Sequence, residues 1–277
     1  MNAVLVGALL MSAAIQPRIL VHGHRGARAM RPENTIPAFK YAIDAGADVL
    51  ELDMAVTKDD VIVVSHDPIL HPPVCSGPSS RAVIHQLTLE QVREWDCGAI
   101  RNPGYPKQQP IPGTRMPTLD EVFALAPTGP VQFNIETKSF PEHPEYTPPP
   151  EEFVRLVLDI IRKHKMETRV ILQSFDFRTL HAMKAIAPEI RLSALTENDK
   201  RDFVTIAGEA GAGIISPHNS LVTAEKVKQA HQASIHVVPW TANDPATWDR
   251  LIEAGVDAII SDDPAALIEH LKRRGYR

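Results

Sequence analysis

Aromatic residues, cysteines and long apolar runs are all scarce in this chain of 277 residues. Only 5% of the residues are aromatic, two are cysteines, and the net charge is a modest −5. A nucleic-acid-binding protein needs a basic surface to neutralise phosphates, so this composition predicts no nucleic-acid partner. Disorder is excluded as well, because an apolar content of 44% is enough to build a large core.

The longest apolar run extends from Ala3 to Ile15, which is shorter than the roughly 20 residues needed to span a membrane. We therefore expect no spanning segment. The run is uncharged and contains the small residues Ser12-Ala13-Ala14, as a secretory signal peptide does before its cleavage site. No Lys or Arg precedes Arg18, so an N-terminal apolar helix is the alternative for residues 1–16. A signal peptide predicts a periplasmic or secreted protein, and the alternative predicts a cytoplasmic one.

Proline is concentrated in one part of the chain, because 16 of the 24 prolines fall between Pro68 and Pro150. We interpret residues 67–116 as a loop-rich insertion within a domain spanning residues 17–277, with a short helix near Thr88–Trp95. Both cysteines, Cys75 and Cys97, lie in this insertion. They could form one disulfide in an oxidising compartment or stay as two thiols in a reducing one, and the sequence leaves both open.

Outside the insertion, short β-branched runs alternate with helix-period segments, the pattern of βα units around a parallel sheet. Eight strands are predicted, at Ile19–Gly23, Val49–Met54, Val131–Glu136, Arg169–Gln173, Ile190–Leu195, Gly213–Ser216, Ile235–Pro239 and Asp257–Ser261. Helices are expected at Thr35–Ala45, Thr118–Ala126, Glu151–Met166, Phe177–Ala187, Thr223–Ala233 and Pro245–Ala254, with Gly46 and Gly255 as stops. Eight strands with helices between them predict an α/β fold of the TIM-type (β/α)8 barrel class, with its chemistry at the carboxyl ends of the strands. An open doubly wound sheet is the alternative.

Carboxylates lie at the ends of two predicted strands. Glu51 and Asp53 have the two-residue spacing that turns both side chains to one face of a strand, and Glu136 ends the next strand. Carboxylates aimed together repel one another unless a proton, a basic group or a divalent cation relieves the repulsion. Oxygen-only ligands favour Mg²⁺ or Ca²⁺, so these residues predict a site for one such cation. The alternative is a set of unrelated, solvated acids.

Two histidines and two cations accompany the acids. His24 follows the first predicted strand, and His66 follows a short strand expected at Val61–Ser65. Imidazole titrates near neutral pH, so this pair fits a general acid and base. Arg25 and Lys138 indicate an anionic substrate such as a phosphate, although Arg25 could instead form an ion pair with an acidic neighbour, Glu33 or Asp53.

Eight short motifs then occur in order between residues 19 and 264. They are His24-Arg25-Gly26-Ala27, Pro32-Glu33-Asn34-Thr35, Glu51-Leu52-Asp53, Ser65-His66-Asp67, Asn134-Ile135-Glu136-Thr137-Lys138, Gln173-Ser174-Phe175, Val238-Pro239-Trp240-Thr241-Ala242-Asn243 and Ile260-Ser261-Asp262-Asp263-Pro264. Together they resemble the signature of the glycerophosphodiester phosphodiesterases. The resemblance implies a TIM-type barrel whose insertion follows the His-Asp motif.

The resemblance also implies metal-dependent hydrolysis of glycerophosphodiesters, small-molecule substrates, to glycerol 3-phosphate and an alcohol. Position by position, His24 and His66 match the acid and base, and Trp240 matches an aromatic wall of the substrate pocket. Arg25 and Lys138 match phosphate contacts. The metal ligands are matched by Glu51, Asp53 and Glu136. The resemblance leaves open whether water or the substrate's own 2-hydroxyl is the nucleophile, and which alcohol is released.

Two other functions fit parts of the sequence. A barrel that binds a phosphorylated headgroup without turnover is one. A metal-dependent amidohydrolase is the other, because His22-Gly23-His24 ends the first strand and His218 and Asp262 could complete its zinc site. The amidohydrolase interpretation leaves the three carboxylates without a role. The oligomeric state does not follow from the sequence.

Overall fold

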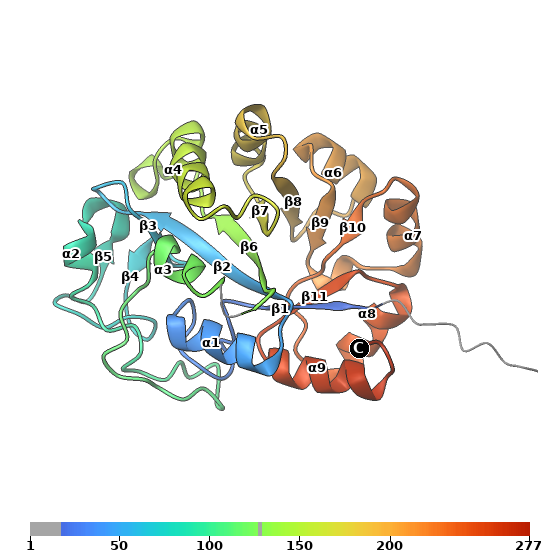
Figure 1. Cartoon of the computed structure of the whole chain (residues 1–277), viewed down its shortest axis with the longest axis horizontal. Helices are drawn as coiled ribbons and strands as arrows, with labels where there is room; N and C mark the ends of the chain where they lie inside the picture. The colour runs from blue at the N-terminus through green and yellow to red at the C-terminus, as the bar shows by residue number, and fades with distance from the viewer. Residues whose placement is uncertain (1–17, 127–128) are drawn as a thin grey trace, which may run out of the picture.

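The computed structural model describes residues 18–126 and 129–277, which form a nearly closed barrel of parallel strands surrounded by helices (Figure 1). The expected N-terminal segment, residues 1–16, lies outside the described residues. Each of the eight predicted strands is present. The barrel strands are β1 (Leu20–Gly23), β2 (Val49–Val56), β6 (Gln132–Thr137), β7 (Val170–Ser174), β8 (Arg191–Thr196), β9 (Ile214–Pro217), β10 (His236–Val237) and β11 (Ala258–Ser261).

The barrel closes between its last two strands. The paired strands run in the order β10-β9-β8-β7-β6-β2-β1-β11. The two ends of this order meet through backbone hydrogen bonds from Asp257 N to Val237 O (3.1 Å) and from Ile260 N to Pro239 O (3.0 Å). An open doubly wound sheet has two unpaired edges, so this closure excludes that alternative and confirms the TIM-type barrel.

Local sequence signals explain where the outer helices begin and end. The side chains of Asp176, Asp202 and Asp244 cap helix N-termini. Gly46 and Gly255 have φ values of 90° and 82° and end their helices as predicted. The helices are α1 (Ile36–Ala45), α3 (Leu119–Phe123), α4 (Pro150–Lys163), α5 (Phe177–Ile186), α6 (Phe203–Ala210), α7 (Ala224–Gln232), α8 (Pro245–Ala254) and α9 (Pro264–Arg273).

Two helices are shorter than the sequence predicted. α3 ends at Phe123 rather than at Ala126, and Ala124 is its C-cap residue. α4 ends at Lys163 rather than at Met166, because Lys165 takes a left-handed conformation with a φ of 56°. Among the described helices, none is long and apolar enough to cross a membrane.

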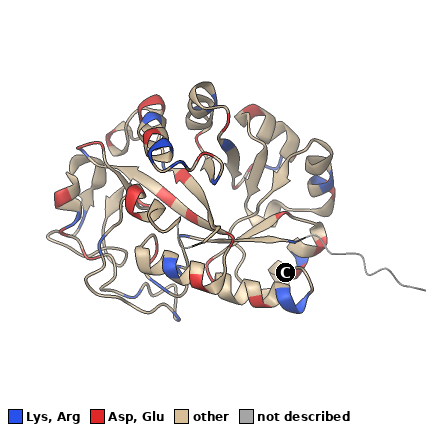
Figure 2. Ribbon diagram, viewed as in Figure 1, with Lys and Arg blue, Asp and Glu red and all other residues tan. Residues whose placement is uncertain are grey.

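The core of the barrel has two parts, one outside the wall of strands and one inside it. The large cluster packs the helices against the outer face of the strands and includes Phe39, Phe133 and Phe153. A smaller apolar cluster fills the barrel interior with Ile171, Ile214, Val238, Ala258 and Ile260. Acidic positions stand out in β2 and β6, where the rest of each strand is uncharged (Figure 2). Buried charge in such strands is costly, so these positions require a functional explanation.

The chain between β2 and α3, which includes the predicted insertion at residues 67–116, forms a lobe beside the barrel. β3 (Ile62–Val64) pairs antiparallel with β2, and a small hairpin follows from β4 (Ile69–Leu70) and β5 (Ala82–Val83). The helix expected at Thr88–Trp95 is α2 (Leu89–Val92). Cys75 and Cys97 form a disulfide in this lobe, which answers the question that the sequence left open. The disulfide packs in its own apolar cluster with Leu70, Ile84 and Trp95.

Candidate metal and phosphate site

Three carboxylates from neighbouring strands meet inside one end of the barrel. Glu51 and Asp53 lie on β2 and Glu136 lies on β6, with Asp53 directly opposite Glu136 in the register. One oxygen of each carboxylate lies within 4.8 Å of the others, and the residues are only 2%, 1% and 6% exposed. No other His, Cys, Asp or Glu group among residues 18–126 and 129–277 meets this criterion. The sequence-predicted ligands are therefore brought together.

Burial and neighbouring charges shift the pKa values of the three carboxylates in different directions. Burial, followed by the charge of Asp53, raises the pKa of Glu51 well above its usual range. Burial also raises the pKa of Glu136, against the opposing charge of Lys138. The pKa of Asp53 is lowered despite its burial, because Arg25, His66 and Lys138 face it. A divalent cation among these oxygens would relieve the repulsion, and the all-oxygen donor set fits Mg²⁺ or Ca²⁺.

His24 lies directly after β1 and is held by a carboxylate from the other end of the chain. Its Nδ1 is 2.5 Å from Oδ1 of Asp262, and its Nε2 is 3.9 Å from Oε2 of Glu51. Burial lowers the pKa of His24 to about 4, although the charge of Asp262 opposes this shift. Burial thus favours the neutral imidazole, whose Nδ1 contacts Asp262 and whose Nε2 faces the acidic cluster.

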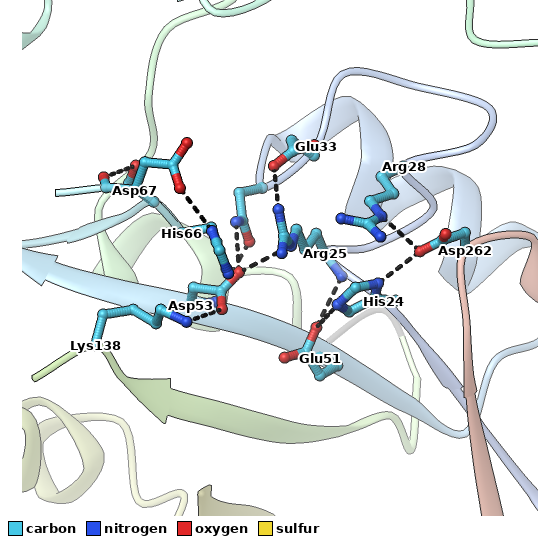
Figure 3. A network of polar contacts seen from close by, with 12 residues as sticks. His24, Arg25, Arg28, Glu33, Glu51, Asp53, His66, Asp67, Lys138 and Asp262 are labelled. Carbon is cyan, nitrogen blue, oxygen red and sulfur yellow. Dashed lines mark hydrogen bonds and ion pairs between the residues drawn. The ribbon is translucent and has the colours of Figure 1, made fainter. Parts of the chain in front are cut away.

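His66 approaches the cluster from the inserted lobe. It follows β3, and its Nδ1 is 2.8 Å from Oδ1 of Asp67. In Figure 3, His24 lies beside Glu51 and His66 beside Asp53, so the two imidazoles flank the carboxylates. His66 is half-buried, whereas His24 is almost fully buried. Both histidines line the same cavity.

Arg25 and Lys138, the two predicted phosphate-binding residues, both form ion pairs with carboxylates. Nη1 of Arg25 lies 2.6 Å from Glu33, and its Nε lies 3.3 Å from Asp53. Both ion pairs that the sequence offered as the alternative role of Arg25 are therefore present. Nζ of Lys138 donates to Oε1 of Glu136 over 2.9 Å. These contacts place the cations beside the carboxylates, where they also border the cavity.

These residues line a cavity of about 260 Å³, and the aromatic side chains of Phe175 and Trp240 line it too. Nε1 of Trp240 donates to the Ser216 carbonyl oxygen over 2.9 Å, which fixes the indole ring. Phe175 packs edge-on against that ring, with 5.6 Å between the centroids. The cavity is lined by His24, Arg25, Arg28, Glu51, Asp53, His66, Glu136, Lys138, Gln173, Phe175, Leu195, Glu197, Trp240, Thr241 and Ile260.

Several supporting residues were not predicted from the sequence as parts of the site. Asn34 donates from Nδ2 to Oδ2 of Asp53 (2.9 Å), and Gln173 donates from Nε2 to Oε1 of Glu51 (2.8 Å). Arg28 donates to Asp262 over 2.6 Å. Asn34 and Gln173 both lie in motifs of the family signature. The motifs could therefore have identified them as site residues, whereas their uncharged amide side chains alone could not.

Comparison with known proteins decides the family. The sequence profile of the glycerophosphoryl diester phosphodiesterase family matches residues 24–266, almost the whole described chain. The chain belongs to this family. It is 32% identical to a glycerophosphodiester phosphodiesterase of Caldanaerobacter subterraneus subsp. tengcongensis over 93% of this chain and 100% of that protein. It is 30% identical to a glycerophosphodiester phosphodiesterase of Bacillus subtilis, over 94% of this chain and 88% of that one.

Solved structures of the family share the fold. A crystal structure from Silicibacter pomeroyi DSS-3, assigned to the glycerophosphoryl diester phosphodiesterases, superposes with a TM-score of 0.87 at 29% identity. It covers 94% of this chain and 95% of that one. An Oleispira antarctica phosphodiesterase, solved with the product sn-glycerol-3-phosphate, superposes with a TM-score of 0.79 at 22% identity over 92% and 97% of the two chains. These matches confirm the resemblance that the motifs indicated.

Family membership and geometry both disfavour the amidohydrolase interpretation. His22 lies one strand step before His24 and lines a different cavity, at the amino ends of the strands. His218 packs against the Trp240 ring, with 5.4 Å between the centroids, and does not join an acidic cluster. Asp262 is occupied by His24 and Arg28. His22, His218 and Asp262 therefore do not come together as the zinc site of an amidohydrolase requires.

Proposed function

We propose that this chain hydrolyses glycerophosphodiesters to glycerol 3-phosphate and an alcohol in the cavity at the carboxyl ends of the barrel strands. The observation that supports this most strongly is the cluster of Glu51, Asp53 and Glu136 between two histidines, in a chain of this family. The cavity is large enough for a small phosphodiester. A barrel that only binds a phosphorylated headgroup would not need two imidazoles facing the same carboxylates.

The three carboxylates would hold one Mg²⁺ or Ca²⁺ ion. Three oxygen donors within 4.8 Å of one another suit these hard cations, and Asn34 and Gln173 orient two of the carboxylates. When bound, the cation would supply positive charge next to the phosphoryl oxygens. Arg25 and Lys138 would add fixed positive charge on the same side, where it offsets the charge that builds up on the phosphoryl group.

His24 and His66 would transfer the protons. Each imidazole has Nδ1 near a carboxylate, Asp262 or Asp67, so each keeps Nε2 available for the substrate. One imidazole takes the proton of the nucleophile, which is water or the 2-hydroxyl of the substrate, and the other gives a proton to the leaving alcohol. Attack by the 2-hydroxyl gives a cyclic phosphate, which water then opens to glycerol phosphate. Trp240, fixed by its bond to Ser216, would form an apolar wall against which the substrate packs.

The direct test is turnover of a substrate panel by the purified, metal-loaded protein. Glycerophosphocholine, glycerophosphoethanolamine, glycerophosphoinositol and glycerophosphoglycerol would each be supplied with Mg²⁺ or Ca²⁺, and glycerol 3-phosphate would be measured by a coupled assay. We expect release from at least one substrate, and at least 100-fold less from E51Q. Binding of these compounds without any release would favour the non-catalytic barrel.

We also propose that the protein is exported to the periplasm or the medium. The support is the apolar N-terminal run followed by small residues, which lies outside the described residues, and the Cys75–Cys97 disulfide. N-terminal sequencing of the protein recovered from its native cells tests this. We expect a start near Gln16 and recovery outside the cytoplasm, and a full-length cytoplasmic protein would contradict the proposal.

A further inference from the structure

The catalytic cavity has two chemically different sides. The side formed by β1, β2 and β6 carries the acid cluster and its cations, which include Arg25 and Lys138. The side that follows β7, β8 and β10 carries Phe175, Glu197 and Trp240. The first side suits a phosphate. The second side combines two aromatic rings with one carboxylate, and neither the proposed chemistry nor the family motifs assign a role to Glu197.

Glu197 is an acid without a partner. It directly follows β8, is exposed and lines the cavity. In the part of the chain that the structure describes, no ion pair or hydrogen bond involves its carboxylate. The nearby Arg201 is engaged elsewhere, at 2.6 Å from Asp199 and 2.7 Å from Glu209. The negative charge of Glu197 is therefore available to a ligand in the cavity.

The two aromatic rings that line the cavity with Glu197 pack against each other. Phe175 is 44% exposed, and its ring stands at 86° to the ring of Trp240. Trp240 is fixed through its indole N–H. Nζ of Lys138 already lies over the Phe175 ring, 6.0 Å from its centroid, so this ring borders both sides of the cavity. Ring faces attract cations, and rings combined with a carboxylate are a recurrent way of binding a quaternary ammonium group. A neutral polyol would lack this charge attraction to the ring faces.

We propose that Glu197, with Phe175 and Trp240, selects substrates whose leaving alcohol carries a cation, with quaternary ammonium alcohols such as choline preferred. The inference rests on the proposed function and names the substrate class for it. The leaving alcohol is the part of the substrate that varies in size, so it belongs at the more exposed side of the cavity. A zwitterionic headgroup would then lie with its phosphate toward Arg25 and Lys138 and its ammonium toward Glu197.

The test compares two substrates of the same shape and different charge. Glycerophosphocholine carries a trimethylammonium group, and glycerophospho-3,3-dimethylbutanol carries a neutral tert-butyl group in its place. The measured quantity is the ratio of kcat/KM for the charged substrate to kcat/KM for the neutral one. We expect this ratio to fall about fivefold in E197Q, on the scale of an exposed charge pair, and further in E197K, where the new charge repels the ammonium.

E225Q is the matched control, because it removes the same charge from an exposed position in the first turn of α7, outside the cavity. We expect its ratio to equal that of the wild type. An unchanged ratio in both E197Q and E197K, with the wild type active, would overturn the role of Glu197 and leave the proposed function intact. Turnover of neither substrate by the metal-loaded wild type would overturn the proposed function and, with it, this inference.

Discussion

Nδ1 of His24 lies 2.5 Å from Oδ1 of Asp262, although the two residues are 238 positions apart in the chain. β1 and β11 pair side by side with Gly23 opposite Ser261, so the residues that follow these partners also face each other. The pairing of the first barrel strand with the last therefore builds the pair. Asp262 is itself oriented by Arg28 and by Asn243, which donates over 2.7 Å.

The first prediction concerns this pair. D262N removes the charge that holds Nδ1 of His24, so we expect kcat to fall by about 100-fold or more with little change in KM. Steady-state kinetics on glycerophosphocholine measure both. D249N is the control, because it breaks another Asp–His pair, Asp249 with His270, on the outer helices. Equal kinetics in D262N and D249N would show that Asp262 does not position His24.

The second prediction is that His24 and His66 act as one unit. Replacement of either with Ala should lower kcat by several orders of magnitude, and the double variant should be little worse than the worse single one. Pre-steady-state and steady-state rates of the wild type, the two single variants and the double variant complete a double-mutant cycle. His85, which contacts the Val56 carbonyl in the inserted lobe, supplies the control H85A with near-wild-type kcat. Additive losses in the double variant would mean that the two histidines act independently.

The third prediction concerns the inserted lobe. The Cys75–Cys97 bridge closes a loop with a sequence separation of 22, and the lobe has only a small apolar cluster of its own. A cross-link of this length is worth about 3 kcal/mol through the chain entropy that it removes from the unfolded state. Urea unfolding of C75A/C97A should show a loss of that size. Alkylation of the native protein that labels two thiols, without reductant, would contradict the pairing.

The fourth prediction is a pH dependence of stability that comes from His22. Burial lowers its pKa in the folded protein to about 3, whereas an unfolded histidine titrates near 6.5. Between these values the unfolded chain binds the extra proton, so stability is full above pH 6.5 and falls as the pH is lowered. The contribution is about 1.4 kcal/mol per pH unit. Urea unfolding of the wild type and H22Q from pH 7.5 to 4.5 should give slopes that differ by this amount, and parallel curves would contradict it.

The barrel strands and the cluster of three acids could be predicted because each depends on local order in the chain. Side chains alternate between the two faces of a strand, so Glu51 and Asp53, two residues apart on β2, point to the same face. Parallel strands bring their carboxyl ends to the same end of the barrel. The partner of His24 could not be found in the same way, since only the pairing of β1 with β11, from opposite ends of the chain, brings Asp262 to it. The ion pairs of Arg25 with Glu33 and Asp53 could not be chosen from the sequence, and neither could the disulfide. Both depend on which residues lie close together in the folded chain.

We expect hydrolysis to depend on a divalent cation held by Glu51, Asp53 and Glu136, and phosphorus NMR of glycerophosphocholine tests this dependence most directly. With Mg²⁺ or Ca²⁺ present, the phosphodiester signal should be replaced by that of glycerol 3-phosphate. EDTA should stop the conversion, excess Mg²⁺ or Ca²⁺ should restore it, and E136Q should show little conversion under any condition. Conversion at an equal rate in the metal-free protein, or restoration by zinc alone, would contradict the account.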